Sequence, residues 1–575
     1  MNNKIRLLFF ISILFVQNIS FAVQESRQTL KDGLIAELHE QVDKRHIDSE
    51  LFHKAISNQS IDIQLTAIKG LGRIGSDGIL TLVTPLLENK NEKIRRAAAF
   101  SLGISGSEKA SKILWSALEI EHDETVKQEI YLGLCNLAGD NLVLDMLARQ
   151  KQEQNIKTRS TIFQGLSTAI TNYKNVSDQI DMSKSQNAID FTELLELFER
   201  DDELSYHVGY FLARVKKIQK QLNPAQLQRF IYLIKSTNNK KMFARLIGKI
   251  TKNKHLANRK LLSWLIEHSE VADVSLATEA TRAMETLLYI PQTQIQLGKL
   301  QASSNLQVAQ TALQALANSS LSGLFIKNLL KKKLKSEHPA LVVEAMSGLI
   351  KRQKREDMSW ALKILTHKNA YVKIKFAQLI ADKDKDGFKN VLIQLSKDKE
   401  PSVANYAKNL LSEKKEKPTT KKLETIPFEQ AKKSIGKKIA LHTSVGDIVI
   451  QLNDQAIYSA ANFERLISEH FYDGSYFSRV IGNFVAQGGD TIGDVEGSSS
   501  QTIREEISFL SHLTGTVGMA TSGKDTGSSQ FFINIGNNVH LDRKYTIFGN
   551  VIQGMENVYK LSNGDQIISA EVMAE

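Results

Sequence analysis

The residues of this chain that could do chemistry lie near its C-terminus, around one arginine in a run of aromatic and glycine residues. Arg479 stands between Phe477 and Ile481 on a stretch typical of a β-strand. Its guanidinium stays protonated and offers several N–H donors in a fixed fork. A fixed donor of this kind could stabilise a transition state in which a lone pair becomes available. Such catalysis needs no nucleophile and no metal, and we expect no cofactor.

Three blocks of residues around this arginine follow one another in a recognisable order. They span 471–490, 515–533 and 540–555, and each combines aromatic residues with glycine turns. In this order the blocks resemble the cyclophilin-type peptidyl-prolyl cis/trans isomerases (rotamases), and the resemblance extends from Lys438 to Val572. One block alone could be a strand ending in a glycine turn, whereas three ordered blocks argue against an unrelated β domain.

The resemblance implies catalysis of rotation about X-Pro peptide bonds. This rotation meets a barrier of about 20 kcal/mol, and the uncatalysed exchange takes tens of seconds or longer. In the twisted state the proline nitrogen becomes pyramidal and accepts a hydrogen bond, which a fixed arginine donor stabilises. By resemblance, Arg479 matches the family's catalytic arginine, and Gln487 matches the glutamine that supports it and the substrate carbonyl.

The resemblance also implies a substrate cleft with two parts. An apolar pocket would hold the proline ring, and a neighbouring edge would pair with the extended peptide in strand fashion. The pocket positions are matched by Phe484, Val485, Phe532, Leu541 and Tyr545. The peptide-binding positions are matched by Ala520, Thr521 and Gln530.

Several positions depart from the commoner family residues. Gly482-Asn483 replaces a Pro-Gly pair, which predicts an altered turn with unchanged chemistry. His540 stands where cyclosporin-sensitive members carry tryptophan, so weak cyclosporin binding is expected, and no metal role is expected for it. Three changes within the cleft predict a different pocket shape and rate: Val485 for methionine, Thr521 for asparagine and Tyr545 for histidine.

The elements that must hold these side chains are predicted by apolar alternation. Residues 448–452 alternate with polar neighbours, as a half-buried strand does, and a turn at Gly446-Asp447 joins them to the strand before. A helix is predicted from Ala460 to Ile467, followed by short β segments with glycine turns. Residues 438–575 are therefore predicted to form a closed antiparallel β-barrel with a few short helices.

An internal repeat occupies the residues before the barrel. Each unit shows two stretches of helical periodicity separated by polar turn residues. Since a single helical hairpin cannot bury its apolar face, consecutive hairpins are expected to stack into an all-α solenoid. The repeat is marked about every 32 residues by Gly70-Leu71, Ser101-Leu102, Gly133-Leu134 and Gly165-Leu166.

These units resemble HEAT repeats, which implies protein binding along a concave face and carries over no catalytic residue. Between residues 174 and 269 the period blurs, and divergent repeats are expected there. A chain of 575 residues is too long for one core, because single cores stop growing near about 250–300 residues. We predict a HEAT-like solenoid over 23–410, a Lys-rich linker over 411–437 and the isomerase domain over 438–575.

The first residues read as a secretory signal peptide over 1–22. Lys4 and Arg6 precede the apolar run Leu7–Val16, and Ser20-Phe21-Ala22 offers small residues for cleavage. An uncleaved membrane anchor is the alternative, although the run is shorter than the roughly 20 residues that span a bilayer. The single cysteine, Cys135, is expected to be a buried small hydrophobe, and export without disulfides suits a bacterial periplasm.

Charge is divided unevenly between the predicted domains. From residue 437 onward nine Lys and Arg face sixteen Asp and Glu, a net charge of −7. The whole chain carries +11, which leaves +18 for residues 1–436. The basic part favours acidic protein surfaces, anionic lipid or cell-envelope polymer, with no nucleic acid expected; a solvated basic surface without a particular partner is equally compatible.

Three hypotheses for the whole protein follow. The first is an exported folding factor, a chaperone-like isomerase whose solenoid recruits Pro-containing clients or a partner protein. The second is a solenoid adaptor whose cyclophilin-like domain only binds Pro-containing segments. The third is an anionic-surface binder with a passenger isomerase. The presence of Arg479, Phe484, Gln487 and Phe532 favours catalysis over binding alone.

Overall fold

The computed structural model describes residues 31–180, 191–200, 203–216, 218–220, 222–321, 323–352, 358–412, 422–423, 425–490, 499 and 501–574. It divides into two compact units, Met1–Leu137 with Pro427–Glu429, and Ala138–Ile426 with Gln430–Glu575. The predicted signal peptide lies outside the described residues. Within those ranges, no helix has both the length and the apolar character needed to cross a membrane.

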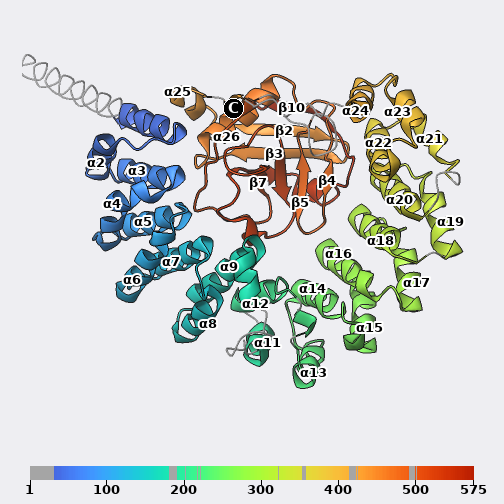
Figure 1. The fold of residues 1–575 in the computed structure, drawn as a ribbon, viewed down its shortest axis with the longest axis horizontal. Helices are drawn as coiled ribbons and strands as arrows, with labels where there is room; N and C mark the ends of the chain where they lie inside the picture. Colours follow the sequence, from blue (N-terminus) through green and yellow to red (C-terminus); the bar gives the residue numbers. More distant parts are fainter. Residues whose placement is uncertain are drawn as a thin grey trace, which may run out of the picture. The chain divides into compact units, whose positions relative to one another are not determined.

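The first unit is a stack of helices that alternate with polar turns, and Figure 1 shows them side by side. Its helices are α2 (Ser49–Ile56), α3 (Ile61–Ile74), α4 (Leu80–Val83), α5 (Glu92–Ile104), α6 (Glu108–Ile120) and α7 (Glu124–Leu137), with 3₁₀ turns η1 (Asp77–Ile79) and η2 (Thr84–Glu88).

Small residues of the repeat allow these helices to pack closely. A Cβ placed on Gly103 of α5 would lie 2.5 Å from the Cα of Gly133 on α7. A Cβ on Gly72 of α3 would lie 2.6 Å from the Cα of Ser101 on α5. Cys135 on α7 is buried, as the sequence predicted. The periodic glycine and serine positions are therefore where successive repeats touch.

The second unit continues the helical repeats. Its helices are α8 (Leu142–Gln152), α9 (Ile156–Asn172), α10 (Lys174–Gln179), α11 (Phe191–Glu199), α12 (Glu203–Leu212), α13 (Pro224–Tyr232), α14 (Lys240–Ile250), α15 (Arg259–His268), α16 (Val274–Ala283), α17 (Pro291–Leu300), α18 (Leu306–Asn318), α19 (Leu324–Lys333), α20 (Pro339–Arg352), α21 (Ala361–Leu365), α22 (Ala370–Asp384), α23 (Lys389–Leu395) and α24 (Pro401–Leu411). Helices therefore continue through the described part of 174–269, where the sequence period blurs.

Many repeats start their second helix with an Asn or Asp side chain. Asn155 accepts a hydrogen bond from the Thr158 backbone N–H at 3.1 Å, and Asp273 accepts one from Leu276 at 3.0 Å. These side chains satisfy donors that the first turn of a helix leaves without partners. The polar turns seen in the sequence are thus helix caps.

The segment predicted as a linker contains ordered elements. Strand β1 (Lys422–Leu423) pairs in parallel with β6 (Gln501–Thr502), and helix α25 (Phe428–Lys432) follows Pro427. Proline suits the residue just before or at the start of a helix, because it lacks the N–H that a first turn leaves unused. The described part of 411–437 therefore contains a short strand and a short helix, and the linker assignment itself stays a prediction.

The barrel is one antiparallel sheet of eight strands in the order β10-β2-β3-β9-β7-β8-β5-β4. Its strands are β2 (Lys438–Thr443), β3 (Gly446–Leu452), β4 (Arg479–Val480), β5 (Val485–Gly488), β7 (Thr516–Met519), β8 (Phe531–Asn534), β9 (Ile547–Gln553) and β10 (Ile567–Val572). Helices α26 (Ile457–Ser468), which contains the predicted 460–467 helix, and α27 (Met555–Val558) accompany it, with the 3₁₀ turn η7 (Val539–Leu541).

Backbone hydrogen bonds join the two ends of this sheet. The N–H of Phe477 donates to the Asp565 carbonyl at 2.8 Å, and the N–H of Ile567 donates to Ser475 at 2.9 Å. The interior is filled by aromatic side chains such as Phe463 and Phe531, whose ring centroids are 5.1 Å apart. The predicted closed β-barrel is confirmed in its strands and its core.

The first hairpin turns two residues earlier than predicted. Gly446 and Asp447 belong to β3, paired with Thr443 and His442, so Ser444 and Val445 make the turn. Gly446 has φ of +122°, a conformation that favours glycine.

Within the second unit, inner helices of the solenoid contact the barrel (Figure 1). The Thr168 hydroxyl of α9 donates to the Val539 carbonyl at 3.0 Å. The Tyr371 hydroxyl of α22 donates to the Ser478 carbonyl at 3.2 Å. The barrel is therefore held by helices that lie far apart along the repeat.

Candidate active site

Strand pairing brings the predicted catalytic side chains onto one face of the barrel. Arg479 of β4 is directly opposite Gln487 of β5, and Gln487 is opposite Phe532 of β8. Because directly paired residues point to the same face of a sheet, these three side chains lie in a row. Their neighbours Val480 and Ala486 point the other way, into the buried core.

The ring of Phe532 lies flat on the sheet because its partner is a glycine. Gly518 of β7 pairs with Phe532, and a Cβ on Gly518 would come within 2.4 Å of the ring. Tyr545 meets the ring edge-to-face at 5.8 Å, and His512 stacks on it at 5.5 Å. Phe532 is thereby fixed as the base of an apolar hollow.

The predicted site residues meet around this hollow. A cleft of about 210 Å³ is lined by Arg479, Phe484, Val485, Gln487, Ala520, Thr521, Phe532, Leu541 and Tyr545. Of the ten predicted site residues only Gln530 is not part of the lining. Its Oε1 accepts a hydrogen bond from Nε2 of Gln487 at 3.0 Å. Gln530 thus orients the glutamine beside the arginine.

The arginine of the cleft is half-buried and points its fork at the glutamine. Arg479 Nη1 donates to Gln487 Oε1 at 3.2 Å, and its Cζ lies 5.4 Å from the ring centroid of Phe484. No carboxylate pairs with it among the described residues. Burial lowers the pKa of Arg479, but a guanidinium stays protonated at any physiological pH. The remaining N–H donors are available to a bound peptide.

His540 lies behind the proline pocket and in contact with the solenoid. Its ring stacks on Phe484 at 5.5 Å, and its Nδ1 accepts hydrogen bonds from the Tyr210 hydroxyl at 2.7 Å and Arg214 Nη2 at 2.9 Å. Burial and the neighbouring Arg214 lower the pKa of His540 to about 2, so the ring is neutral with its proton on Nε2.

The Gly482-Asn483 turn is also a solenoid contact. Arg282 of α16 donates to the Gly482 carbonyl at 2.8 Å, and Asn483 Nδ2 donates to the Ser275 carbonyl at 2.5 Å. Asn483 has φ of +60°, which asparagine tolerates better than most residues. The expected altered turn therefore has a structural use, since it joins the pocket rim to α16.

Two supporting residues were not found by sequence reasoning. Asn538 Nδ2 donates to the Phe484 carbonyl at 2.7 Å, and His512 Nε2 donates to the Tyr545 carbonyl at 3.2 Å. Burial lowers the pKa of His512 to about 4, so it packs as a neutral ring. Neither residue lies in a recognisable motif, and only the fold brings them behind the cleft.

The cleft holds a cation, an amide and an apolar floor, and its lining residues include no Ser, Cys, Lys, His or carboxylate side chain. Among the described residues no group of three His, Cys, Asp or Glu side chains could hold a metal ion. The guanidinium donors lie beside an apolar hollow that could hold a proline ring. Such a site suits rotation about the peptide bond before proline, a reaction in which no covalent bond is broken. The fold and this site define a peptidyl-prolyl isomerase.

Comparisons with known proteins agree with this assignment of the barrel. The model of the cyclophilin type peptidyl-prolyl cis-trans isomerase family matches residues 438–573, and the HEAT repeat model matches residues 49–135. Peptidyl-prolyl cis-trans isomerase-like 3 of Gallus gallus is 41% identical over 129 residues, covering 21% of this chain and 80% of that protein. Peptidyl-prolyl cis-trans isomerase B of Bacillus subtilis is 44% identical over 119 residues, covering 20% and 82%.

A third relative is almost entirely this domain. The peptidyl-prolyl cis-trans isomerase of Synechococcus elongatus is 40% identical over 138 residues, covering 24% of this chain and 95% of that protein. A crystal structure of a Cryptosporidium parvum cyclophilin type isomerase matches with 26% identity and a TM-score of 0.23, covering 24% of this chain and 98% of that chain. The chain belongs to the cyclophilin-type peptidyl-prolyl cis-trans isomerase family and carries HEAT repeats before the isomerase domain.

Proposed function

We propose that this protein is an exported folding factor in which the solenoid recruits Pro-containing clients and presents them to the isomerase cleft. The contacts of Asn483 and His540 with the solenoid carry this proposal. One residue precedes Phe484 in sequence and the other stacks on its ring, so the solenoid touches both sides of the proline pocket.

A client bound to the helical repeats would therefore stay near a cleft of fixed position. Linking a binding surface to a catalytic site raises the local concentration of the client at that site. The net charge of +18 over residues 1–436 favours clients or partner proteins with acidic surfaces, and anionic lipid or envelope polymer shares that chemistry.

The test uses a client protein whose refolding is limited by one X-Pro bond, together with a short X-Pro peptide. The full chain is compared with residues 430–575 and with the full-length Arg479→Ala variant. The barrel can be studied alone because its core cluster is made of its own residues, and the Synechococcus elongatus relative is nearly this domain by itself.

We expect similar kcat/KM on the peptide for the full chain and the barrel, but a lower KM on the protein client for the full chain. Arg479→Ala should lower both activities by about 10²–10³-fold. Equal KM values on the protein client would contradict recruitment by the solenoid. A cellular effect that survives Arg479→Ala would instead support a solenoid adaptor.

Export is the second part of the proposal. It is supported by Lys4 and Arg6 before the apolar run Leu7–Val16. N-terminal sequencing of the protein recovered from a bacterial expression host should begin near Val23. Recovery from the cytoplasmic fraction with Met1 intact would contradict it.

A further inference from the structure

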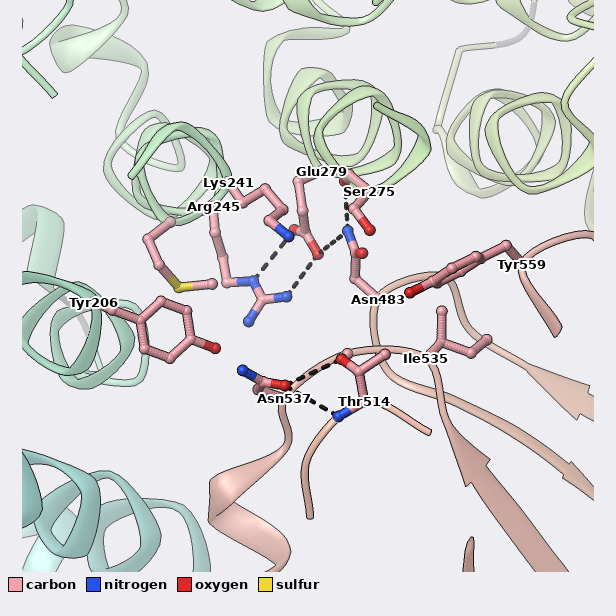
Figure 2. A pocket seen from close by; sticks show the side chains of 12 residues that line it. Tyr206, Lys241, Arg245, Ser275, Glu279, Asn483, Thr514, Ile535, Asn537 and Tyr559 are labelled. Atoms are coloured by element: carbon pink, nitrogen blue, oxygen red, sulfur yellow. Dashed lines mark hydrogen bonds and ion pairs between the residues drawn. The ribbon is translucent and has the colours of Figure 1, made fainter. Parts of the chain in front are cut away.

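A small cavity lies within the second unit where helices of the solenoid meet loops of the barrel (Figure 2). We call it the interface cavity, and its volume is about 100 Å³. From the solenoid it is lined by Tyr206 of α12, Lys241 and Arg245 of α14, and Glu279 of α16; from the barrel it is lined by Asn483 and Asn537.

Glu279, the one carboxylate among the described residues that line the interface cavity, is already occupied. Glu279 accepts hydrogen bonds from Arg245 Nη2 at 2.6 Å and Nε at 3.2 Å, and from Arg282 Nη1 at 2.7 Å. Burial alone would raise the pKa of Glu279, but the two guanidinium groups outweigh it and lower the pKa to about 2. Two arginines share one carboxylate, so the region keeps a net positive charge, to which Lys241 adds.

Hydrogen-bond donors remain and face the hollow. Arg245 uses Nε and Nη2 on Glu279, and Nη1 has no partner among the described residues. The amide of Asn537 is fixed because its Oδ1 accepts from the backbone N–H and hydroxyl of Thr514 at 3.0 and 3.1 Å. Its Nδ2 therefore points toward Tyr206 and Arg245, as Figure 2 shows, and it forms a hydrogen bond with the Tyr206 hydroxyl, which leaves its second N–H for a ligand.

We propose that the interface cavity binds an oxyanion, either a free phosphate or the carboxylate of an acidic side chain. Guanidinium and amide donors around a net positive hollow match the oxygen atoms of such a group. The volume admits a group of that size and excludes a folded peptide segment. The ligand would touch α14 and the Asn537 loop at once, and so bridge solenoid and barrel.

The barrel side of the interface cavity is adjacent to the proline pocket. Asn483 immediately precedes Phe484, and Asn537 immediately precedes Asn538, whose Nδ2 holds the Phe484 carbonyl at 2.7 Å. A ligand that binds only when the solenoid helices contact the barrel loops stabilises that contact by mass action. An oxyanion bound in the interface cavity should therefore hold Phe484 and the proline pocket more rigidly in place. This consequence rests on the isomerase activity.

The binding test uses inorganic phosphate and the full chain, with chloride at equal ionic strength as reference. Isothermal titration and the thermal midpoint are measured for the parent, Lys241→Gln and Lys240→Gln. Lys240 is the neighbouring exposed lysine of α14 outside the interface cavity, so its variant is a matched loss of one charge. These readouts do not depend on catalysis.

We expect saturable phosphate binding that Lys241→Gln weakens about tenfold or more and Lys240→Gln leaves unchanged. The isolated barrel, which lacks α12 and α14, should not respond. No saturable binding by the parent chain, to phosphate or to the peptides below, or equal effects of the two lysine variants, would overturn the proposal.

Kinetics with two peptides identify the source of the oxyanion. If it is a client side chain, Lys241→Gln should raise KM for an X-Pro peptide with a flanking glutamate and leave a neutral peptide unchanged. If the oxyanion is a free anion, added phosphate should alter the turnover of both peptides by the parent chain and should not alter their turnover by Lys241→Gln.

Discussion

Replacing the cleft arginine separates its charge from the geometry of its donors. Arg479 contacts Gln487 through Nη1 at 3.2 Å, with no paired carboxylate in the described part of the chain. Its other donors are therefore aimed at substrate. Arg479→Ala removes every donor, whereas Arg479→Lys keeps the charge but cannot hold Gln487 and the proline nitrogen together in one plane.

The expected loss follows from the number of donors removed. Losing one aligned donor to a transition state typically lowers kcat by about 10²–10³-fold, roughly 2.7–4 kcal/mol. We expect Arg479→Ala in that range, and Arg479→Lys between it and the parent. Because the side chain is half-exposed and makes no ion pair in the described residues, neither variant should change the thermal midpoint.

The assay is the cis/trans exchange rate of a short X-Pro peptide by two-dimensional exchange NMR, with the full chain at several peptide concentrations. kcat should fall while KM changes little, since the apolar floor around Phe532 is intact. A folded Arg479→Ala variant that keeps more than about a third of kcat/KM would refute the role assigned to this arginine. Arg479→Lys at the parent rate would show that charge alone suffices.

Three further outcomes are expected. Burial raises the pKa of Glu344 to about 7, so the folded chain keeps a proton that the unfolded chain loses above about pH 4.5. The free energy of unfolding should therefore fall as the pH rises from about 4.5 to 7. Measured by urea titration, Glu344→Gln should add about 3 kcal/mol to the free energy of unfolding at pH 8 and nothing at pH 4. Gly103→Ala should lower the unfolding free energy by about 1–3 kcal/mol, because the new methyl meets Gly133 at 2.5 Å; an unchanged urea midpoint would contradict that packing. Cyclosporin should inhibit only weakly, because His540 replaces the tryptophan of sensitive members and is engaged by Tyr210; tight stoichiometric inhibition would disprove this.

Much of the active site follows from local sequence. The resemblance to the cyclophilins predicted Arg479 and Gln487 as the catalytic pair, and the strand pairing in the structure then places both on one face of the sheet. The glycine turns and aromatic spacing of the barrel are also local signals. The helical repeat can also be predicted from local signals, because each hairpin has the same apolar spacing and the same polar helix caps.

Local signals failed where a residue's partner lies far along the chain. The 411–437 segment reads as a polar linker, yet Lys422 and Leu423 pair with Gln501 and Thr502. The polar composition of a segment predicts that its side chains are solvated. It does not show whether its backbone pairs with a strand far along the chain. The hairpin turn was misplaced by two residues because glycine occurs both in turns and at strand ends.

The sequence by itself determined a repeated helical scaffold, a β-barrel and the side chains of the isomerase cleft. The tertiary structure alone decided that the solenoid touches this cleft, through Tyr210 and His540, which are 330 residues apart. That contact depends on the small rotation between many successive repeats. No periodicity within one repeat encodes the sum of those rotations, so the interface cavity and the support of the proline pocket could be read only from the folded chain.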